Sequence, residues 1–163
     1  MKNLSLYFAY GSNMEPARMA RRCPGAYPLG RAVLRNYKLT ERLYADIDFL
    51  EGGSVSGFLY LITEHHLKSL DAYEGYPKVY RRMWLDVEFR RETYQAVTYE
   101  MTAETKLVRN GLSYPEEYRK ICSAGAKFRH VKNQFVKRRT KAIMYRRWSK
   151  ITRKAVEKGL LVK

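Results

Sequence analysis

The sequence contains little cysteine and no long hydrophobic run. Its two cysteines, Cys23 and Cys122, form neither a CxxC motif nor a disulfide framework, which is typical of a reducing intracellular compartment. No apolar stretch approaches the roughly 20 residues of a membrane span, and the opening residues MKNLSLYFAY lack the pattern of a signal peptide. We therefore expect a cytoplasmic protein with no membrane partner.

Histidine is equally scarce. The histidines are His65, His66 and His130, and no cluster of cysteines or carboxylates accompanies them at metal-ligand spacing. Because adjacent residues of a helix point in different directions, His65 and His66 are not expected to share a ligand. We predict that all three histidines lie at the surface and that the chain has no metal site. The isolated cysteines likewise carry no motif for thiol chemistry.

Acidic residues are nearly absent from the C-terminal part of the chain. The formal net charge is +16, and residues 127–163 contribute +13 of it, with fourteen Lys or Arg and the single acid Glu157. Residues 1–126 carry the remaining net charge of +3. The composition thus changes near Ala126, and we predict one domain over residues 1–126 followed by a basic helical extension over residues 127–163.

Material for a hydrophobic core is present, since 45% of the residues are hydrophobic and fourteen are tyrosines. Alternating or continuous apolar patterns predict five strands, over residues 4–10, 31–40, 55–63, 83–89 and 95–101. Helical spacing predicts helices over residues 14–23, 64–75 and 115–126. Thr63 suits the N-cap of the second helix, and Gly75 suits its C-terminal end. This order indicates a mixed α+β fold with a largely antiparallel sheet, for which closure into a small barrel is one arrangement.

A glycine joins the first predicted strand directly to the first predicted helix, in the stretch YFAYGSNM of residues 7–14. Gly11 lets the chain turn sharply, and we expect unpaired amide N–H groups from Ser12 to Met14 to point outward there. Such groups form a cradle for a carboxylate or for an oxyanion that develops during a reaction. A simple tight turn is the alternative that the sequence leaves open.

Glu74 is the second candidate for a functional residue, because it ends a predicted helix amid aromatic residues. Desolvation by these neighbours would raise the pKa of its carboxyl toward the range useful for general acid–base catalysis near neutral pH. The neighbours that we expect to shield it are Tyr73, Tyr76 and Tyr80. The alternative is a solvated carboxylate at the helix end, paired with Arg81 or Arg82.

Three stretches, YFAYGSNM, LDAYEGYPKVY and PEEYRKICSAGA, follow one another in an order and at separations that resemble the gamma-glutamylcyclotransferase family. Two further stretches support the resemblance: NMEPARMARRCPGA looks like the first helix of the family, and GGSVSGFLYLIT resembles the strand before its catalytic helix. The resemblance covers about residues 4–127. It is specific because several motifs are shared in one order.

The resemblance implies a small, mixed and mostly antiparallel β-barrel surrounded by helices, with a pocket at its mouth. Members of the family convert a gamma-glutamyl amide into 5-oxoproline and a free amine, and this implies a small-molecule gamma-glutamyl substrate and no cofactor, metal or covalent intermediate. Carried over to this chain, Glu74 is the acid and base. The residues that correspond to the substrate-binding positions are Tyr10, Gly11, Ser12, Asn13, Tyr80 and Tyr118.

Two alternatives to this activity stay open. The same fold would also suit the tailoring of a gamma-glutamyl group on a larger carrier. In a different class, the barrel would be a catalytically spent scaffold that binds nucleic acid or another polyanion through residues 127–163. We expect Met144, Trp148 and Ile151 of that extension to pack on the barrel or on the second subunit of a homodimer.

Overall fold

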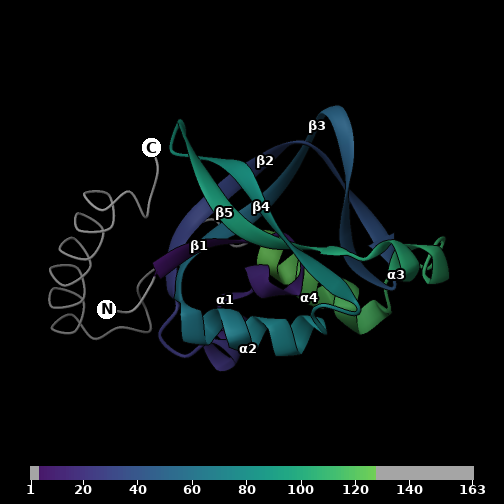
Figure 1. The fold of residues 1–163 in the computed structure, drawn as a ribbon, viewed down its shortest axis with the longest axis horizontal. Coiled ribbons are helices and arrows are strands. Elements are labelled where there is room, and N and C mark those ends of the chain that lie inside the picture. Colours follow the sequence, from purple (N-terminus) through teal and green to yellow (C-terminus); the bar gives the residue numbers. More distant parts are fainter. Residues whose placement is uncertain (1–3, 128–163) are drawn as a thin grey trace, which may run out of the picture.

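Five strands form a closed barrel in this computed structural model, which describes residues 4–127. Around the barrel the strands follow the order β1, β3, β2, β4, β5, and only the contact that joins β1 to β5 is parallel (Figure 1). The strands are β1 (Leu4–Ala9), β2 (Tyr27–Arg42), β3 (Tyr44–Thr63), β4 (Tyr80–Phe89) and β5 (Glu92–Met101). The prediction of a small, mixed and mostly antiparallel barrel is confirmed.

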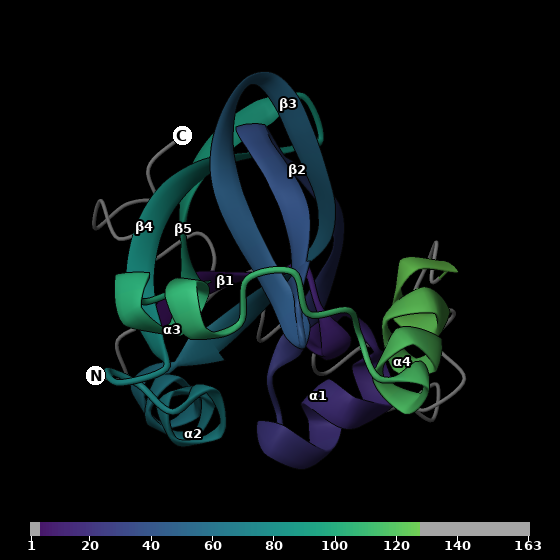
Figure 2. The same ribbon diagram turned by 90° about the vertical axis from the view of Figure 1, so that its right-hand side faces the viewer.

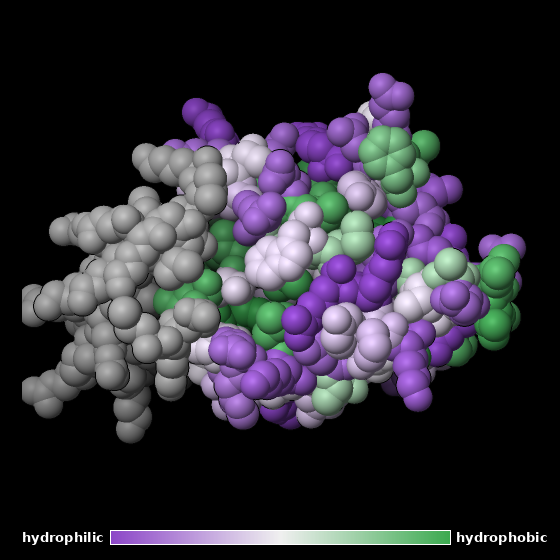
Figure 3. All heavy atoms as spheres, viewed as in Figure 1, coloured by the Kyte–Doolittle hydropathy of each residue, from purple (hydrophilic) through white to green (hydrophobic). Residues whose placement is uncertain are grey.

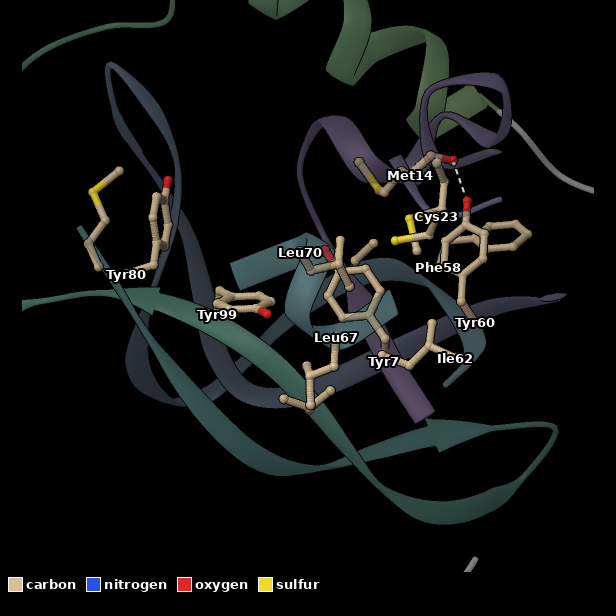
Figure 4. Packing of buried hydrophobic residues seen from close by; sticks show 14 residues of the cluster. Tyr7, Met14, Cys23, Phe58, Tyr60, Ile62, Leu67, Leu70, Tyr80 and Tyr99 are labelled. Atoms are coloured by element: carbon tan, nitrogen blue, oxygen red, sulfur yellow. Dashed lines mark hydrogen bonds between the residues drawn. The ribbon is translucent and has the colours of Figure 1, made fainter. Parts of the chain in front are cut away.

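Strand β1 is apolar from Leu6 to Ala9, where both of its faces are buried. Leu6, Phe8 and Tyr10 belong to the core inside the barrel. Tyr7 and Ala9 point the other way, since side chains alternate along a strand, and they belong to a second core between the barrel and its helices. In Figure 4 the second core is seen from close by, with side chains of strands and helices packed together.

The helices lie mostly on one side of the barrel. Figures 1 and 2 show α1, α2 and α4 together on that side, with α3 near the end of the hairpin formed by β2 and β3. The helices are α1 (Pro16–Arg22), α2 (Glu64–Glu74), α3 (Ala103–Val108) and α4 (Glu116–Lys127), and a 3-10 helix, η1 (Ser12–Met14), precedes α1. Hydrophilic residues cover much of the view in Figure 3, with hydrophobic groups at the end where α3 lies.

The ends of α2 confirm the two predicted caps. The first turn of this helix also shows that the surface position predicted for one histidine is wrong. Thr63 caps the first turn, and Gly75 ends the helix in the left-handed conformation, with φ of 65°. His66 was expected at the surface but is buried, because its ring completes the capping box with Thr63 and its Nε2 contacts the carbonyl oxygen of Pro24 at 3.0 Å. His65 is exposed, as predicted.

The hairpin of β2 and β3 is longer than its sequence pattern predicts. Residues 41–54 continue the two strands around Leu43, whose φ is 65°. Side chains of both strand faces are exposed over residues 49–52, so the alternation that marks a strand is missing there. The short helix α3 was also not predicted, and none of its residues is buried.

The predicted basic helical extension lies outside the described residues from residue 128 onward, together with the face at Met144, Trp148 and Ile151 and with His130. Its division from the barrel domain stays a prediction. Within residues 4–127, no helix is long and apolar enough to cross a bilayer.

Candidate active site

A pocket opens where the end of β1, the turn at η1, the end of α2 and helix α4 meet. It holds about 320 Å³ of space, part of which is open to solvent. All seven residues predicted as catalytic or substrate-binding line it: Tyr10, Gly11, Ser12, Asn13, Glu74, Tyr80 and Tyr118. The structure therefore brings together residues from four separate parts of the sequence, although their roles stay predictions.

The carboxyl group of Glu74 lies in the pocket wall and is held from one side. Asn13 Nδ2 donates a hydrogen bond to Glu74 Oε1 at 3.1 Å, and Arg22 Nη1 lies 3.8 Å from the same oxygen. The side chain of Glu74 is only 18% exposed. The alternative of a solvated carboxylate paired with Arg81 or Arg82 is wrong.

Those two arginines have other partners. Arg82 forms an ion pair with Asp71, a residue of α2, and Arg81 forms one with Glu100 at 2.8 Å. They therefore leave the carboxylate of Glu74 to Asn13 and to the more distant Arg22.

The amide of Asn13 has one orientation that satisfies all its neighbours. Arg22 Nη1 donates to Asn13 Oδ1 at 2.8 Å, and because a guanidinium only donates, the amide oxygen must face it. The amide nitrogen then donates its two protons to the Tyr7 hydroxyl, at 2.8 Å, and to Glu74. Asn13 is thus fixed by three contacts, and it fixes Glu74 in turn.

Burial raises the pKa of the Glu74 carboxyl above its ordinary value. The positive charge of Arg22, the hydrogen bond from Asn13 and the charge of Arg18 oppose this effect without cancelling it. A carboxylate in this position has a higher proton affinity than one in water. It is therefore suited to accept a proton from a substrate ammonium and to return it.

The tyrosines that shield Glu74 are mostly not those expected from its neighbours in sequence. Tyr73 and Tyr76 are 57% and 41% exposed, so that expectation is wrong for both. Tyr80 is buried and lines the pocket, as predicted. The remaining phenols of the wall are Tyr7, Tyr10, Tyr99 and Tyr118.

These phenols are neutral hydrogen-bonding groups. Burial raises the pKa of each one above the ordinary value for tyrosine, which keeps the proton on oxygen. The Tyr10 hydroxyl donates to the carbonyl oxygen of Tyr99. In Figure 4 the labelled rings of Tyr7, Tyr80 and Tyr99 come from three different strands. The pocket therefore has one titratable carboxyl among phenols that stay protonated.

Gly11 is required by close packing. A Cβ atom at this position would lie 2.9 Å from Ala45 Cβ and 3.0 Å from the Tyr118 hydroxyl, closer than such contacts normally are. Its φ is −113°, which other residues also adopt. A second close approach occurs at Gly125 of α4, where a Cβ would lie 2.8 Å from Met14 Cβ, so this glycine lets α4 pack against the turn.

The turn presents fewer free amide groups than expected. The amide N–H of Met14 donates to the Gly11 carbonyl oxygen at 3.0 Å, so the prediction of an unpaired group is wrong for this residue. The amide N–H groups of Ser12 and Asn13 have no protein acceptor among residues 4–127. Two donors are therefore available at the pocket wall beside Glu74.

Three lining residues were not predicted: Tyr7, Ala45 and Tyr99. Ala45 contributes its backbone, because its carbonyl oxygen accepts from the Tyr80 hydroxyl at 2.8 Å and its amide N–H donates to the Tyr118 oxygen at 3.3 Å. No side-chain pattern marks such a role. Tyr7 had a weak signal, because its hydroxyl lies in a mostly apolar strand, whereas the mixed sequence of β5 gave none for Tyr99.

A closed barrel with one half-buried carboxyl, a fixed amide and a wall of neutral phenols defines a small-ligand site of the acid–base type. The profile of the gamma-glutamyl cyclotransferase, AIG2-like family matches residues 7–120, a range that includes every residue of this site. The chain belongs to this family.

Individual relatives agree with the family assignment. The chain is 32% identical to human gamma-glutamylcyclotransferase over 136 residues, which are 75% of this chain and 70% of that protein. It is 40% identical over 96 residues to YkqA of Bacillus subtilis, covering 53% of this chain but only 35% of that longer relative. The crystal structure of an uncharacterized human protein, loc79017, superposes with a TM-score of 0.68 at 27% identity, covering 82% of this chain and 85% of that one.

Proposed function

We propose that this protein is a gamma-glutamylcyclotransferase, which cyclises a gamma-glutamyl amine or peptide to 5-oxoproline and releases the free amine. The observation that carries the proposal is the half-buried Glu74 carboxyl, whose pKa is raised and whose position is fixed by Asn13 at the pocket wall. Membership of the family and the likeness to human gamma-glutamylcyclotransferase support the same activity.

The reaction begins with a proton transfer. Glu74 removes one proton from the α-ammonium group of the substrate, and the neutral amine attacks the carbonyl carbon at the gamma position. A carbon–nitrogen bond forms and the electron pair of the carbonyl moves onto oxygen. The free amide N–H groups of Ser12 and Asn13 are the donors suited to stabilise this oxyanion.

The second half returns the proton. Protonated Glu74 donates it to the nitrogen of the leaving amine as the old carbon–nitrogen bond breaks and the carbonyl forms again. The ring nitrogen loses its extra proton to solvent, and the released amine takes one up as an ammonium ion. Because the attack is intramolecular, the protein has only to hold a bent substrate and to move protons.

The neutral phenols suit this role. They donate or accept hydrogen bonds without bringing a negative charge next to Glu74, since burial raises the pKa of each of them. The alternative of a polyanion-binding scaffold depends on residues 127–163, of which only Lys127 is described. No residue of the barrel is invoked by that alternative.

The proposal is tested with a panel of substrates, by measuring the products that are formed from each. Purified protein is incubated with gamma-glutamyl-alanine, gamma-glutamyl-ethylamine and ε-(gamma-glutamyl)-lysine, and both products are quantified. We expect 5-oxoproline and free amine in equal amounts from at least one compound, with the Glu74→Gln variant as the control for contaminating activity. Formation of free glutamate in place of 5-oxoproline would identify a hydrolase, and no turnover of the whole panel would overturn the proposal.

A further inference from the structure

Asp71 is a second carboxylate on the face of α2 that carries Glu74, since the two residues lie about one helical turn apart. Both side chains are largely covered, with exposed fractions of 15% for Asp71 and 18% for Glu74. Glu74 lines the pocket, whereas Asp71 lies outside the pocket lining and contacts residues of β4 and β5. Asp71 can therefore act on the pocket only through its neighbours.

The carboxylate of Asp71 and the guanidinium of Arg82, a residue of β4, form a bidentate pair. Arg82 Nε donates to Asp71 Oδ1 at 2.8 Å, and Arg82 Nη2 donates to Asp71 Oδ2. Two parallel hydrogen bonds fix the orientation of both groups as well as the distance between them. The guanidinium also lies over the ring of Tyr76, 4.8 Å from the ring centre. Arg82 therefore joins β4 both to the last turn of α2 and to the segment that follows it.

The backbone of Asp71 ends the helix around Glu74. Its carbonyl oxygen accepts the amide N–H of Gly75 and, at 2.9 Å, that of Tyr76. Glu74 lies between Asp71 and Gly75 in the sequence, within the turn that these hydrogen bonds close. A displacement of Asp71 would therefore move the backbone of Glu74 as well.

The same carboxylate orients one phenol of the pocket wall. The hydroxyl of Tyr99, a lining residue of β5 whose ring is labelled in Figure 4, donates to Asp71 Oδ1 at 2.8 Å. Burial and this hydrogen bond raise the pKa of the Tyr99 phenol, which therefore keeps its proton. Because that proton is directed at Asp71, the Tyr99 oxygen presents only lone pairs to the pocket.

The apolar contacts of α2 with the barrel are less directional. Leu67 and Leu70 pack into the core between the barrel and its helices. Apolar packing resists the separation of two surfaces but has no preferred direction along them. The charged contact between Asp71 and Arg82 is directional, and it is therefore suited to fix where the end of α2 lies relative to the pocket.

We propose that Asp71 is a positioning residue, which anchors the end of α2 to Arg82 and thereby holds Glu74 and the Tyr99 hydroxyl in the arrangement that the reaction requires. This inference rests on the proposed function. Proton transfer depends steeply on such an arrangement, since a misplacement of about 1 Å lowers a rate by about 10²-fold. Asn13 fixes the carboxyl group of Glu74, and Asp71 fixes the helical turn that carries it.

Removal of either partner should lower turnover more than substrate binding. In Asp71→Asn and in Arg82→Gln, each measured on the gamma-glutamyl compound that the wild type converts fastest, we expect kcat to fall by about tenfold to a hundredfold. KM should change much less, because the amide donors of Ser12 and Asn13 are independent of this pair. Both variants are assayed well below their melting temperatures, so that a loss of kcat belongs to folded protein. Arg82→Lys, which keeps the charge without the planar fork, should lose less.

An NMR titration of the Glu74 side-chain carboxyl gives a second readout that needs no substrate. Release of the helix end would let water reach Glu74, and its pKa would move down toward the ordinary glutamate value, since burial is what raises it. We expect this downward shift in both variants. Charge alone would act in opposite directions, because loss of the negative Asp71 lowers the pKa of Glu74 and loss of the positive Arg82 raises it.

Arg35→Gln is the matched control. Arg35 donates from Nε and Nη2 to Glu88, at 3.0 Å and 2.8 Å, and this pair joins β2 to β4 away from the pocket lining. The control therefore removes an arginine with two donating nitrogens and the same charge as Arg82. We expect it to retain the wild-type kcat and the wild-type titration of Glu74.

The outcomes separate this inference from the proposed function. An unchanged kcat in Arg82→Gln, or shifts of the Glu74 pKa in opposite directions in the two variants, would overturn the role of Asp71 and leave the proposed function intact. If the wild type formed 5-oxoproline from no compound, the proposed function would be wrong, and the titration would still show whether Asp71 fixes Glu74.

Discussion

The molecule holds its carboxylates in two contrasting environments. In the pocket, Glu74 has one hydrogen bond from Asn13 and one cation at 3.8 Å, and part of its surface faces open space. At the end of the hairpin, Asp46 and Asp48 are surrounded by donors. Asp46 accepts from the Met101 amide at 2.8 Å and from Arg42, and Asp48 accepts from Thr40, Arg42 and Lys106.

The difference shows how a carboxyl group either joins elements of the fold or exchanges a proton, depending on its surroundings. The pKa of Asp48 is held well below its ordinary value by hydrogen bonds from Arg42, Lys106 and Thr40, which outweigh the effect of burial. The pKa of Glu74 is raised, because burial outweighs its few partners. Asp48 therefore stays ionised and joins β2, β3 and α3, whereas Glu74 retains the capacity to exchange a proton.

The largest effect that we expect comes from Glu74→Gln. Glutamine keeps the size of the side chain but cannot accept a proton from an ammonium group, so kcat for 5-oxoproline formation should fall by about 10²–10⁴-fold. The melting temperature at neutral pH should not fall. A carboxyl whose pKa is raised by folding favours the folded state when protonated and loses that contribution as the pH rises through its folded pKa, so its replacement removes a cost at neutral pH.

Glu64→Gln is the control for this prediction. Glu64 lies on the same helix, is exposed and forms an ion pair with Lys68 at 3.7 Å, far from the pocket lining. We expect its activity to match that of the wild type. A Glu74→Gln variant as active as Glu64→Gln would remove Glu74 from the mechanism.

Substitutions at Gly11 test the part of the pocket wall that is formed by the turn between β1 and α1. In Gly11→Val the new side chain would meet Ala45 and the Tyr118 hydroxyl, which must move for the pocket to form. We expect kcat/KM to fall by about 10²-fold, the scale on which a misplacement of about 1 Å lowers activity. Ser12→Ala keeps the backbone donors and should lose much less. Equal, mild losses in the two variants would mean that the turn only connects β1 to α1.

The acids at the hairpin end should affect folding more than chemistry. Asp46 is fully buried, and Asp46→Ala leaves the Met101 amide without its acceptor and leaves Arg42 with Asp48 as its remaining partner. We expect the free energy of unfolding, measured in urea, to fall by about 1–3 kcal/mol, as when a buried donor loses its partner. Glu88→Ala breaks an exposed pair with Arg35 on the same barrel and should cost far less.

A smaller effect is expected from Arg22, the last residue of α1, whose Nη1 atom lies 3.8 Å from the carboxyl group of Glu74. Its positive charge lowers the pKa of Glu74, so Arg22→Gln should raise that pKa. Glu74 must be ionised to accept the substrate proton, and the acid limb of the kcat/KM profile should therefore move to higher pH. Arg21→Gln, one residue earlier and exposed, is the matched control and should leave the limb in place. A shift to lower pH in Arg22→Gln would contradict the electrostatic account.

Local patterns predict much of this fold, and long-range closure explains what they miss. The strand, turn and helix around Gly11, and the caps at Thr63 and Gly75, depend on residues close in sequence. By contrast, Ala45 reaches the pocket only because the barrel closes and brings its backbone to Tyr80 and Tyr118.

The same distinction between local sequence patterns and long-range contacts applies to the site. The position of Tyr118 is predicted by the family resemblance alone, since nothing in its local pattern distinguishes it from other tyrosines, whereas Tyr80 is also expected near Glu74 from its place in the sequence. The shield around Glu74 is misjudged because Tyr73 and Tyr76 are its neighbours in sequence, whereas Tyr7 and Tyr99 approach it through strand pairing. A hydroxyl on a mostly apolar strand was the available signal for Tyr7, and the mixed sequence of β5 gave no such signal for Tyr99.

The contrast between the two acidic sites is tested most directly by an NMR titration of the side-chain carboxyl carbons, with signals assigned through Glu74→Gln and Asp48→Asn. We predict that Glu74 titrates above the ordinary glutamate value of about 4.3 and Asp48 well below the ordinary aspartate value of about 3.9. A Glu74 carboxyl that titrates at or below the ordinary value would contradict the account of a desolvated acid poised for proton transfer.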